Sequence, residues 1–464
     1  MNTHPDLHDP SALLIRGGRL VDPASDTDGL YDILLRDGRI AEILPGGGDA
    51  AGAVPAGAGA DAAAPAAPAA PGNTCPVLDA SGLVVAPGLI DTHSHFRDPG
   101  FTYKEDLLTG AAAAAKGGYT SIILMANTKP VVDNVEVLTD ILRRGSEAPV
   151  HLYSCSNVTV GMQGCSLAEL DALADAGAAG FTDDGVPIQD GELLRRALRI
   201  ARRRDLPVSL HEEDKSMITE NGINAGGHAA RVLGLTGAPR EAEISMIRRD
   251  VQIAVEEQAP LCIQHISTAE GVQLIREARK QNPRIHAEAT PHHFSLTEEA
   301  VLTRGTLAKV NPPLRLESDR RAIIEGLADG TLDLIATDHA PHAAYEKEKP
   351  FVQAPSGMIG LETALSLAIE HLVRAGYLSL SQMLACLTVH PADFYHLPAG
   401  RVAPGAPADL VLFDPDEAFT VPDHFASKSS NSPFIGMRLH GVVKYTIAGG
   451  RIVYSFSEKE DPKK

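Results

Sequence analysis

The sequence predicts an α/β protein, a (β/α)8 barrel with a small β-sandwich domain built from the N- and C-terminal segments. Short apolar runs alternate with helical stretches rich in Ala, Leu, Arg and Glu between residues 87 and 397. Strand-like runs separated by turns occupy both ends of the chain. The length of 464 residues is about three times the ~150 residues of a typical domain, which leaves room for a large domain with an addition.

The N-terminal part of the β domain is expected over residues 1–86. Its first apolar runs are divided by Gly17-Gly18 and by Asp37-Gly38, which we interpret as turns. Asp-Gly between apolar runs is a strong signal for a β-hairpin. The predicted strands are residues 12–16, 19–21, 31–35 and 39–43.

Residues 49–72 have a different composition, with 13 Ala, 4 Gly, 4 Pro, 2 Asp and one Val. Such a segment has too little large apolar surface to offset the entropy of ordering it. We therefore expect a disordered surface insertion. Strand character returns at residues 77–79 and 83–86.

The C-terminal part of the β domain is expected over residues 398–464. Residues 408–414 and 442–454 are apolar, strand-like runs separated by turns, the same pattern as in the N-terminal segment. We expect the two ends to pair into one small domain, with the barrel at residues 87–397 as a separate insertion between them.

The barrel region contains eight candidate strands separated by helical stretches. Alternation of this kind is typical of βα units and a parallel sheet, and eight strands over about 300 residues fit a (β/α)8 barrel. The candidate strands are residues 88–91, 121–125, 150–153, 180–182, 208–211, 261–265, 285–288 and 334–338.

Charge and composition exclude several classes of function. The 41 Lys and Arg against 60 Asp and Glu give a net charge of −19, which disfavours nucleic acid or an anionic membrane as a partner. No apolar stretch approaches the ~20 residues of a membrane span, and the start of the chain lacks a signal peptide, so we expect a cytoplasmic protein. The five scattered cysteines contain no CxxC pair, which excludes a disulfide framework.

Residues able to bind metal recur at the C-terminal ends of the predicted strands. Barrels of this type place their active sites at that face. A single histidine at a strand end is more often a hydrogen-bonded core residue, but recurrence on five strands is hard to explain by packing. These residues are His93 and His95 after strand one, Asp183 and Asp184 after strand four, His211 and His265 closing strands five and six, and Asp338, His339 and His342 at strand eight.

The pattern predicts a centre that binds two metal ions. His93 and His95 alternate along an extended chain, so both imidazoles can reach one ion. Four imidazoles and at least two carboxylates suit Zn²⁺, and either Asp183 or Asp184 could bridge two ions. Zinc lowers the pKa of bound water towards ~7, so the chemistry indicated is metal-assisted hydrolysis or its reverse.

Several motifs carry a more specific resemblance, in order along the barrel. The chain resembles the amidohydrolase superfamily and, within it, the dihydroorotases. The continuation Arg97-Asp98-Pro99-Gly100 is what narrows the superfamily to that branch. The motifs are Asp91-Thr92-His93-Ser94-His95, Met125-Ala126-Asn127-Thr128, Phe181-Thr182-Asp183-Asp184-Gly185, His211-Glu212-Glu213-Asp214, His265-Ile266-Ser267-Thr268, Thr290-Pro291-His292-His293, Asn311-Pro312-Pro313, Ala336-Thr337-Asp338-His339-Ala340-Pro341-His342 and Ser356-Gly357-Met358.

The resemblance implies two Zn²⁺ ions per subunit, bridged by Asp184 and a hydroxide. It assigns one ion to His93, His95 and Asp338, and the other to His211 and His265. In many related amidohydrolases a carbamylated lysine makes the bridge. No lysine occurs here between Lys129 and Lys215, which indicates the bacterial class I type with an aspartate bridge.

The resemblance also implies a set of substrate contacts. Arg97 and Asn127 would bind the substrate carboxylate with help from His342, since a planar guanidinium grips a carboxylate at two points. The alternatives are a salt bridge for Arg97 and a turn cap for Asn127. The full set implied is His95, Arg97, Asn127, Asn311, His342, Ser356 and Gly357.

The activity implied is the reversible cyclisation of N-carbamoyl-L-aspartate to dihydroorotate in pyrimidine biosynthesis, with Asp338 as the catalytic acid and base. One alternative is another cyclic-amide hydrolase, an allantoinase or hydantoinase. Another is a non-catalytic scaffold for aspartate carbamoyltransferase, which would be expected to have lost metal ligands. We also expect a homodimer and association with aspartate carbamoyltransferase as additions to activity.

Overall fold

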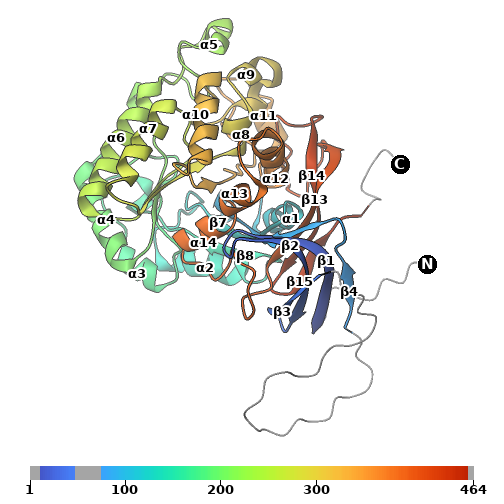
Figure 1. Cartoon of the computed structure of the whole chain (residues 1–464). Helices are drawn as coiled ribbons and strands as arrows, with labels where there is room; N and C mark the ends of the chain where they lie inside the picture. The colour runs from blue at the N-terminus through green and yellow to red at the C-terminus, as the bar shows by residue number, and fades with distance from the viewer. Residues whose placement is uncertain (1–10, 47–74, 458–464) are drawn as a thin grey trace.

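The computed structural model describes residues 11–46 and 75–457. The insertion predicted at residues 49–72 lies outside the described residues. A ring of parallel strands with helices around it stands beside a large twisted sheet that contains both ends of the described chain (Figure 1). The predicted combination of a barrel and a β domain formed by the two ends of the chain is therefore confirmed.

The barrel is built from two parallel sheets. The first has the order β6-β7-β8 and the second β12-β11-β10-β9. A parallel bridge between Ser94 and His339 joins the two sheets on one side. The strands are β6 (Leu89–Ser94), β7 (Tyr119–Leu124), β8 (His151–Ser154), β9 (Val208–Leu210), β10 (Leu261–Ile263), β11 (Ile285–Ala289) and β12 (Leu334–Ile335).

The fourth predicted strand, residues 180–182, differs from expectation because it is reduced to one bridging residue. Phe181 makes parallel bridges to Ser156 on one side and to Val208 on the other, and so joins the two sheets. Just beyond it the ladder stops because the Asp183 carboxylate, rather than a backbone carbonyl, accepts hydrogen bonds from the amides of Val158 and Thr159.

Helices surround the barrel (Figure 1). In α4 the apolar side chains of Leu194 and Leu198 are buried, whereas Arg203 is exposed and pairs with Asp171, as expected for an outer face. The α-helices are α1 (Leu107–Lys116), α2 (Val135–Gly145), α3 (Leu170–Asp175), α4 (Gly191–Arg204), α5 (His228–Leu233), α6 (Arg240–Glu257), α7 (Ala269–Arg279), α8 (Pro291–Ser295), α9 (Glu299–Arg304), α10 (Glu317–Ala328), α11 (Ala344–Lys347), α12 (Ala364–Ala368), α13 (Leu380–Ala385) and α14 (Val389–Phe394). There are also 3₁₀ helices η1 (Val160–Met162), η2 (Lys215–Met217) and η3 (Gly305–Ala308), and a π-helix η4 (Ile369–Val373). No helix in the described parts of the chain is long and apolar enough to cross a membrane.

The β domain is one eight-stranded sheet that combines both ends of the chain. Its order is β15-β14-β13-β5-β1-β2-β3, with β4 paired to β1. The strands are β1 (Ala12–Asp22), β2 (Thr27–Arg36), β3 (Arg39–Pro45), β4 (Val77–Asp79), β5 (Val84–Pro87), β13 (Leu410–Thr420), β14 (Arg438–Ala448) and β15 (Arg451–Ser455).

The two predicted glycine turns have different outcomes. Asp37-Gly38 does turn the chain between β2 and β3, and both residues have positive φ, 49° and 74°, as a tight hairpin requires. The turn predicted at Gly17-Gly18 is wrong, because β1 runs through it with a register shift between Ile15 and Gly18. A Cβ on Gly18 would lie 2.4 Å from Val85, so this glycine is required by close packing rather than by a turn.

The side chains of a central strand of the sheet point alternately into the apolar core of the sheet and into the core of the barrel. Leu410 and Leu412 of β13 lie in the sheet's own apolar core, whereas Val411 and Phe413 lie in the core of the barrel. Because side chains alternate along a strand, one strand can serve both. β5 pairs with β13 and is followed almost directly by β6, so this packing positions the strand that carries His93 and leads into His95.

Candidate metal centre

The six predicted metal ligands are brought together at the C-terminal ends of the barrel strands. Each belongs to a different strand end, except for His93 and His95, which share β6 and the residue after it. All six are buried, with at most 7% of any residue exposed. The six are His93, His95, Asp184, His211, His265 and Asp338.

One group of three ligands is formed by His93, His95 and Asp338. One donor atom from each lies within 4.8 Å of the other two. Oδ1 of Asp338 is 3.1 Å from Nε2 of His95 and 3.6 Å from Nε2 of His93. This is the set that the resemblance assigns to the first ion.

A second group contains His93, Asp184 and His265, again with donor atoms within 4.8 Å of one another. The Asp184 carboxylate lies between the groups, with Oδ1 3.5 Å from Nε2 of His93 and Oδ2 3.5 Å from Nε2 of His95. His211 is at the edge, with Nδ1 3.0 Å from Nε2 of His265 and 3.9 Å from Oδ1 of Asp184.

The donor set fits a metal ion because some of its buried nitrogens lack another partner. Nε2 of His93 and Nδ1 of His265 are buried without a hydrogen-bond partner among the described residues. Buried polar atoms are nearly always paired, so each such nitrogen needs an explanation. Imidazole nitrogens and carboxylate oxygens grouped in this way are ligands that divalent zinc prefers.

The electrostatics favour a cation at the centre. Burial raises the pKa of Asp184, but the neighbouring imidazoles of His93, His95 and His211 outweigh it and bring the pKa well below its ordinary value. Burial lowers the pKa of His93, but Asp184 and Glu288 outweigh it and raise the pKa well above its ordinary value. The buried carboxylates thus stabilise positive charge at His93, and a metal ion would replace that proton.

Two carboxylates behind the histidines were not singled out by sequence reasoning. Oε2 of Glu288 lies 3.0 Å from Nδ1 of His93, and Oε2 of Glu213 lies 3.1 Å from Nε2 of His211. Such carboxylates orient the imidazole that binds metal and fix its tautomer. The available signal was the acidic residues in the mostly buried segments 285–288 and 211–214, which are Glu288 in the first and Glu212, Glu213 and Asp214 in the second.

Asp183 and Asp184, which sequence alone left as alternatives for the bridge, point to different surroundings. Asp183 Oδ1 accepts hydrogen bonds from the amides of Val158 at 2.9 Å and Thr159 at 3.2 Å, and Oδ2 accepts one from the Thr159 hydroxyl. Asp183 therefore organises the preceding loop, and only Asp184 lies among the histidines.

Arg97 lies close to the centre and is not used in a salt bridge. Its Nε donates to the Pro341 carbonyl at 3.3 Å, and no described carboxylate lies within 4 Å of its guanidinium. Burial lowers the pKa of Arg97, partly offset by the charges of Asp338 and Asp184. The salt-bridge alternative is thus not observed among the described residues.

Asn127 connects two of the candidate ligands. Its Oδ1 is 3.0 Å from Nδ1 of His95, and its Nδ2 donates to Oδ2 of Asp184 at 2.8 Å. The side chain therefore faces the centre and does not cap a turn. The amide oxygen makes Nδ1 of His95 the donor, so Nε2 is the nitrogen that faces Asp338 and Asp184.

The other predicted substrate contacts lie on neighbouring loops. Nε2 of His342 donates to the Ser356 carbonyl at 2.9 Å, and its Nδ1 lies 3.4 Å from the Lys104 ammonium. A Cβ on Gly357 would come within 3.1 Å of Nε2 of His342, so this glycine is packed against the same ring. Oδ1 of Asn311 is buried and has no hydrogen-bond partner among the described residues.

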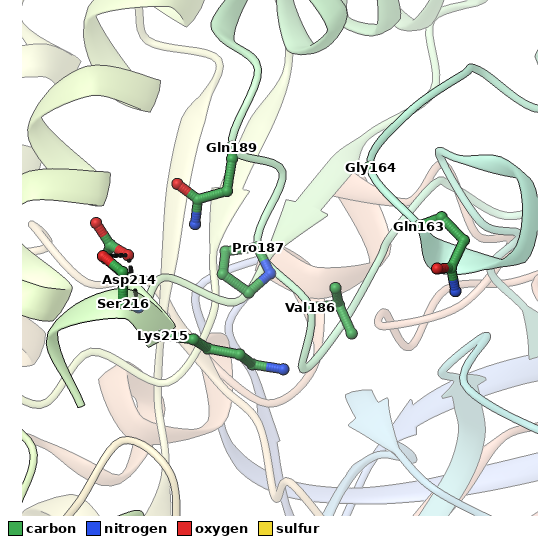
Figure 2. Close-up of a pocket in the computed structure, with 8 residues that line it drawn as sticks. All are labelled: Gln163, Gly164, Val186, Pro187, Gln189, Asp214, Lys215 and Ser216. Carbon is green, nitrogen blue, oxygen red and sulfur yellow. Dashed lines mark hydrogen bonds between the residues drawn. The ribbon is translucent and has the colours of Figure 1, made fainter. Parts of the chain in front are cut away.

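Two neighbouring features are separate from the centre. His339 is held by the backbone, since its Nδ1 accepts from the Gly360 amide at 3.2 Å. A cavity of about 400 Å³ lies beside the loop that follows Asp184. Figure 2 shows its wall, which includes Val186, Pro187 and Lys215 but none of the six candidate ligands.

Comparison with known proteins agrees with this geometry. Residues 84–453 match the sequence family described as Amidohydrolase family. The chain belongs to the amidohydrolase family. Curated relatives of this amidohydrolase include the dihydroorotase of Clostridium acetobutylicum, 48% identical over 95% of this chain and 99% of the relative. The dihydroorotase of Lactococcus lactis is 46% identical over 95% of this chain and 99% of the relative.

Solved structures confirm the fold of this amidohydrolase. The L-hydantoinase (dihydropyrimidinase) from Arthrobacter aurescens superposes with a TM-score of 0.83 and covers 96% of each chain, at 24% sequence identity. The dihydropyrimidinase from Brevibacillus agri gives a TM-score of 0.78 at 23% identity, covering 96% of this chain and 95% of its own. At these identities the likeness concerns the fold alone.

Proposed function

We propose that this amidohydrolase is a dihydroorotase, which reversibly cyclises N-carbamoyl-L-aspartate to dihydroorotate in pyrimidine biosynthesis. The observation that carries the proposal is a buried cluster of six candidate metal ligands with a guanidinium beside it that has no carboxylate partner among the described residues. The near full-length similarity to proteins named dihydroorotase supports it.

The residues present would hold two zinc ions. His93, His95 and Asp338 would bind one ion, His211 and His265 the other, and Asp184 would bridge them. When bound, zinc would polarise a substrate carbonyl and lower the pKa of water at the site.

Arg97 would bind and orient the substrate through its carboxylate. A guanidinium without a carboxylate partner among the described residues is available to form two parallel hydrogen bonds with a carboxylate of the substrate. Asn127, held between His95 and Asp184, is the second group we assign to this end of the substrate, and His342 is the third. His95 and Asn311 and the backbone of Ser356 and Gly357 complete the proposed contacts.

Asp338 would move the proton. In the hydrolytic direction Asp338 accepts a proton from the attacking water and then donates it to the ring nitrogen as the carbon–nitrogen bond breaks. Burial raises the pKa of Asp338, but its hydrogen bond with His95 and the adjacent His93 outweigh this and lower it. The carboxylate is therefore ionised at neutral pH and able to act as a base.

Turnover of alternative substrates tests the proposal. The purified protein should hydrolyse dihydroorotate and cyclise N-carbamoyl-L-aspartate, with little activity on hydantoin or allantoin. The Arg97→Met variant should raise KM for dihydroorotate about 100-fold, because it removes a charge-assisted two-point contact. Preferential turnover of hydantoin or allantoin would overturn the assignment in favour of that hydrolase.

A non-catalytic scaffold is disfavoured because all six candidate ligands are present and buried together. Formation of a homodimer and association with aspartate carbamoyltransferase stay predictions.

A further inference from the structure

Two lysines outside the metal centre are buried beneath one loop of the barrel mouth. We define the 348–357 loop as the residues that follow α11 and end in Ser356 and Gly357. Lys309 precedes the Asn311 segment, and Lys347 ends α11. Only 2% of Lys309 and 5% of Lys347 is exposed, which is unusual for lysine.

Lys309 binds residues 351–354 of the loop through its ammonium group. Nζ donates to the carbonyl of Phe351 at 2.6 Å and to that of Ala354 at 2.7 Å. The same ammonium lies 5.0 Å from the centre of the Phe351 ring. Its methylene stem packs on Gly222, where a Cβ would come within 2.4 Å of Cγ of Lys309.

Lys347 binds the second half of the loop. Its Nζ donates to the Pro355 carbonyl at 2.8 Å and to the Gly357 carbonyl at 2.9 Å. The Gly357 amide in turn donates to the Lys309 carbonyl at 2.8 Å. The two ammonium groups therefore donate to carbonyls of five loop residues, which are Phe351, Val352, Ala354, Pro355 and Gly357. The Gly357 carbonyl also accepts from Nδ2 of Asn431 at 3.1 Å.

Carbonyl oxygens, rather than carboxylates, are the partners of both lysines. No carboxylate of the described residues lies within 4 Å of either Nζ. Lys347 lies between two acidic residues in the sequence, exposed Glu348 and buried Glu346. Glu346 pairs with Lys104 at 3.0 Å and lies 3.7 Å from Nδ1 of His342. The remaining charge facing Lys347 is that of Lys309, whose effect is repulsive.

The loop connects to the substrate side of the metal centre through its last two residues. The Ser356 carbonyl accepts the hydrogen bond of His342, and Gly357 is packed against the same imidazole. A shift of the loop would therefore move both His342 and the backbone that we assign to the substrate ring.

We propose that Lys309 and Lys347 are positioning residues that clamp the 348–357 loop and so set its backbone, together with His342, for substrate binding. The substrate part of this inference rests on the proposed function. The clamp itself does not, because it is defined by hydrogen bonds within the chain.

The hydrogen bonds of the clamp should weaken as the pH rises. Burial lowers the pKa of Lys309 to about 8, and burial together with the charge of Lys309 lowers that of Lys347 to about 7. The charged or titratable groups around Lys347 are Lys309, Glu346 and His342, with Lys104 beyond Glu346. Raising the pH through this range removes the charge that strengthens the hydrogen bonds to the loop, so the loop should loosen.

Hydrogen–deuterium exchange of the whole protein, followed by mass spectrometry, tests the clamp. Lys309→Met and Lys347→Met keep the side-chain length but remove the donors, and exposed Lys349→Met in the same loop is the matched control. We expect amide exchange in residues 348–357 to accelerate about tenfold in the first two variants and not in the control. Unchanged exchange in both would overturn the proposal.

Steady-state kinetics on the same variants test the substrate part. KM for dihydroorotate should rise about tenfold in Lys309→Met and Lys347→Met, with kcat changed by less than about twofold. Lys309→Arg, which keeps the charge and the donors, should partly restore KM. Faster exchange with an unchanged KM would overturn the positioning role, whereas absence of dihydroorotate turnover in the unmodified protein would instead overturn the proposed function.

If a variant does not fold, the unmodified protein still provides a test. After correction for the intrinsic pH dependence of exchange, residues 348–357 should lose protection between about pH 6 and about pH 9 relative to α6. If the ratio of exchange rates between residues 348–357 and α6 does not change over this pH range, the clamp is overturned.

Discussion

Glu288 lies directly behind the first candidate ligand, with its Oε2 3.0 Å from Nδ1 of His93. Its other carboxylate oxygen accepts a hydrogen bond from the Thr92 hydroxyl at 2.8 Å. Both partners are on β6, so a carboxylate from β11 crosses the barrel interior to fix the strand that begins the metal centre. Because Nδ1 is engaged by Glu288, Nε2 is the nitrogen that faces Asp184 and Asp338.

Replacing Glu288 should weaken metal binding. Glu288→Gln keeps the shape and one hydrogen bond but removes the charge that makes His93 a better ligand. We expect the affinity for zinc to fall about 10- to 100-fold, as is typical when such a carboxylate is lost. Competition with a chelator of known affinity measures this, and Glu325→Gln on α10 is the control. Equal zinc affinity in Glu288→Gln and the unmodified protein would contradict the role given to this pair.

Replacing Asp338 separates ligand and proton-transfer roles. Asp338→Asn should retain most zinc, because an amide oxygen can still coordinate, but kcat for dihydroorotate should fall about 10²- to 10⁴-fold since the amide cannot accept a proton. Metal content and turnover measured on the same preparation check this. Retained turnover would mean that Asp338 is only a structural ligand.

The two adjacent aspartates should respond differently to the same substitution. Asp184→Asn should lower metal content and turnover, because Asp184 is the carboxylate among the histidines. Asp183→Asn should instead lower the free energy of unfolding by ~1–3 kcal/mol, since it disrupts buried hydrogen bonds to Val158 and Thr159. Denaturant unfolding and metal analysis of both variants give the comparison, and the reverse pattern would exchange the two roles.

His293 should contribute to the pH dependence of stability. It is buried, with Nδ1 2.7 Å from the Thr290 hydroxyl and Nε2 donating to the Pro312 carbonyl at 3.0 Å. Burial lowers its pKa to about 4, so the unfolded chain binds the proton more tightly. Stability should therefore fall as the pH decreases from about 6.5 to about 4, by up to about 3 kcal/mol from this residue.

The variant His293→Gln isolates that contribution. Glutamine retains an N–H donor for the Pro312 carbonyl but does not titrate, so its stability should fall less steeply over the same pH range. Urea unfolding at several pH values measures the difference. Parallel curves for the two proteins would show that the His293 pKa is not lowered by folding.

Most of the barrel and of its metal centre could be predicted from sequence because both follow from local patterns. Buried strands are short apolar runs, and parallel strands bring their C-terminal ends to one face, so His93, His211 and His265 could be expected to meet. The fourth predicted strand is reduced to one bridging residue because the Asp183 side chain replaces the backbone ladder after Phe181. Nothing in a single strand's sequence indicates that substitution.

Contacts between residues that are far apart in the sequence could not be predicted. Glu288 and His93 are far apart in the sequence, and only the closed barrel brings them together. The bulge at Gly18 was interpreted as a turn because a Gly-Gly pair has the same appearance in either case, and the deciding contact with Val85 comes from another strand. The same applies to Lys309 and Lys347, which appear in the sequence as ordinary lysines.

Metal content measured together with dihydroorotate hydrolysis tests the central claim most directly. The purified protein should contain about two zinc ions per chain, lose activity in step with their removal by a chelator, and regain it when zinc is restored. Full hydrolysis of dihydroorotate by protein stripped of metal would contradict the account, as would a protein with both ions bound that does not hydrolyse dihydroorotate.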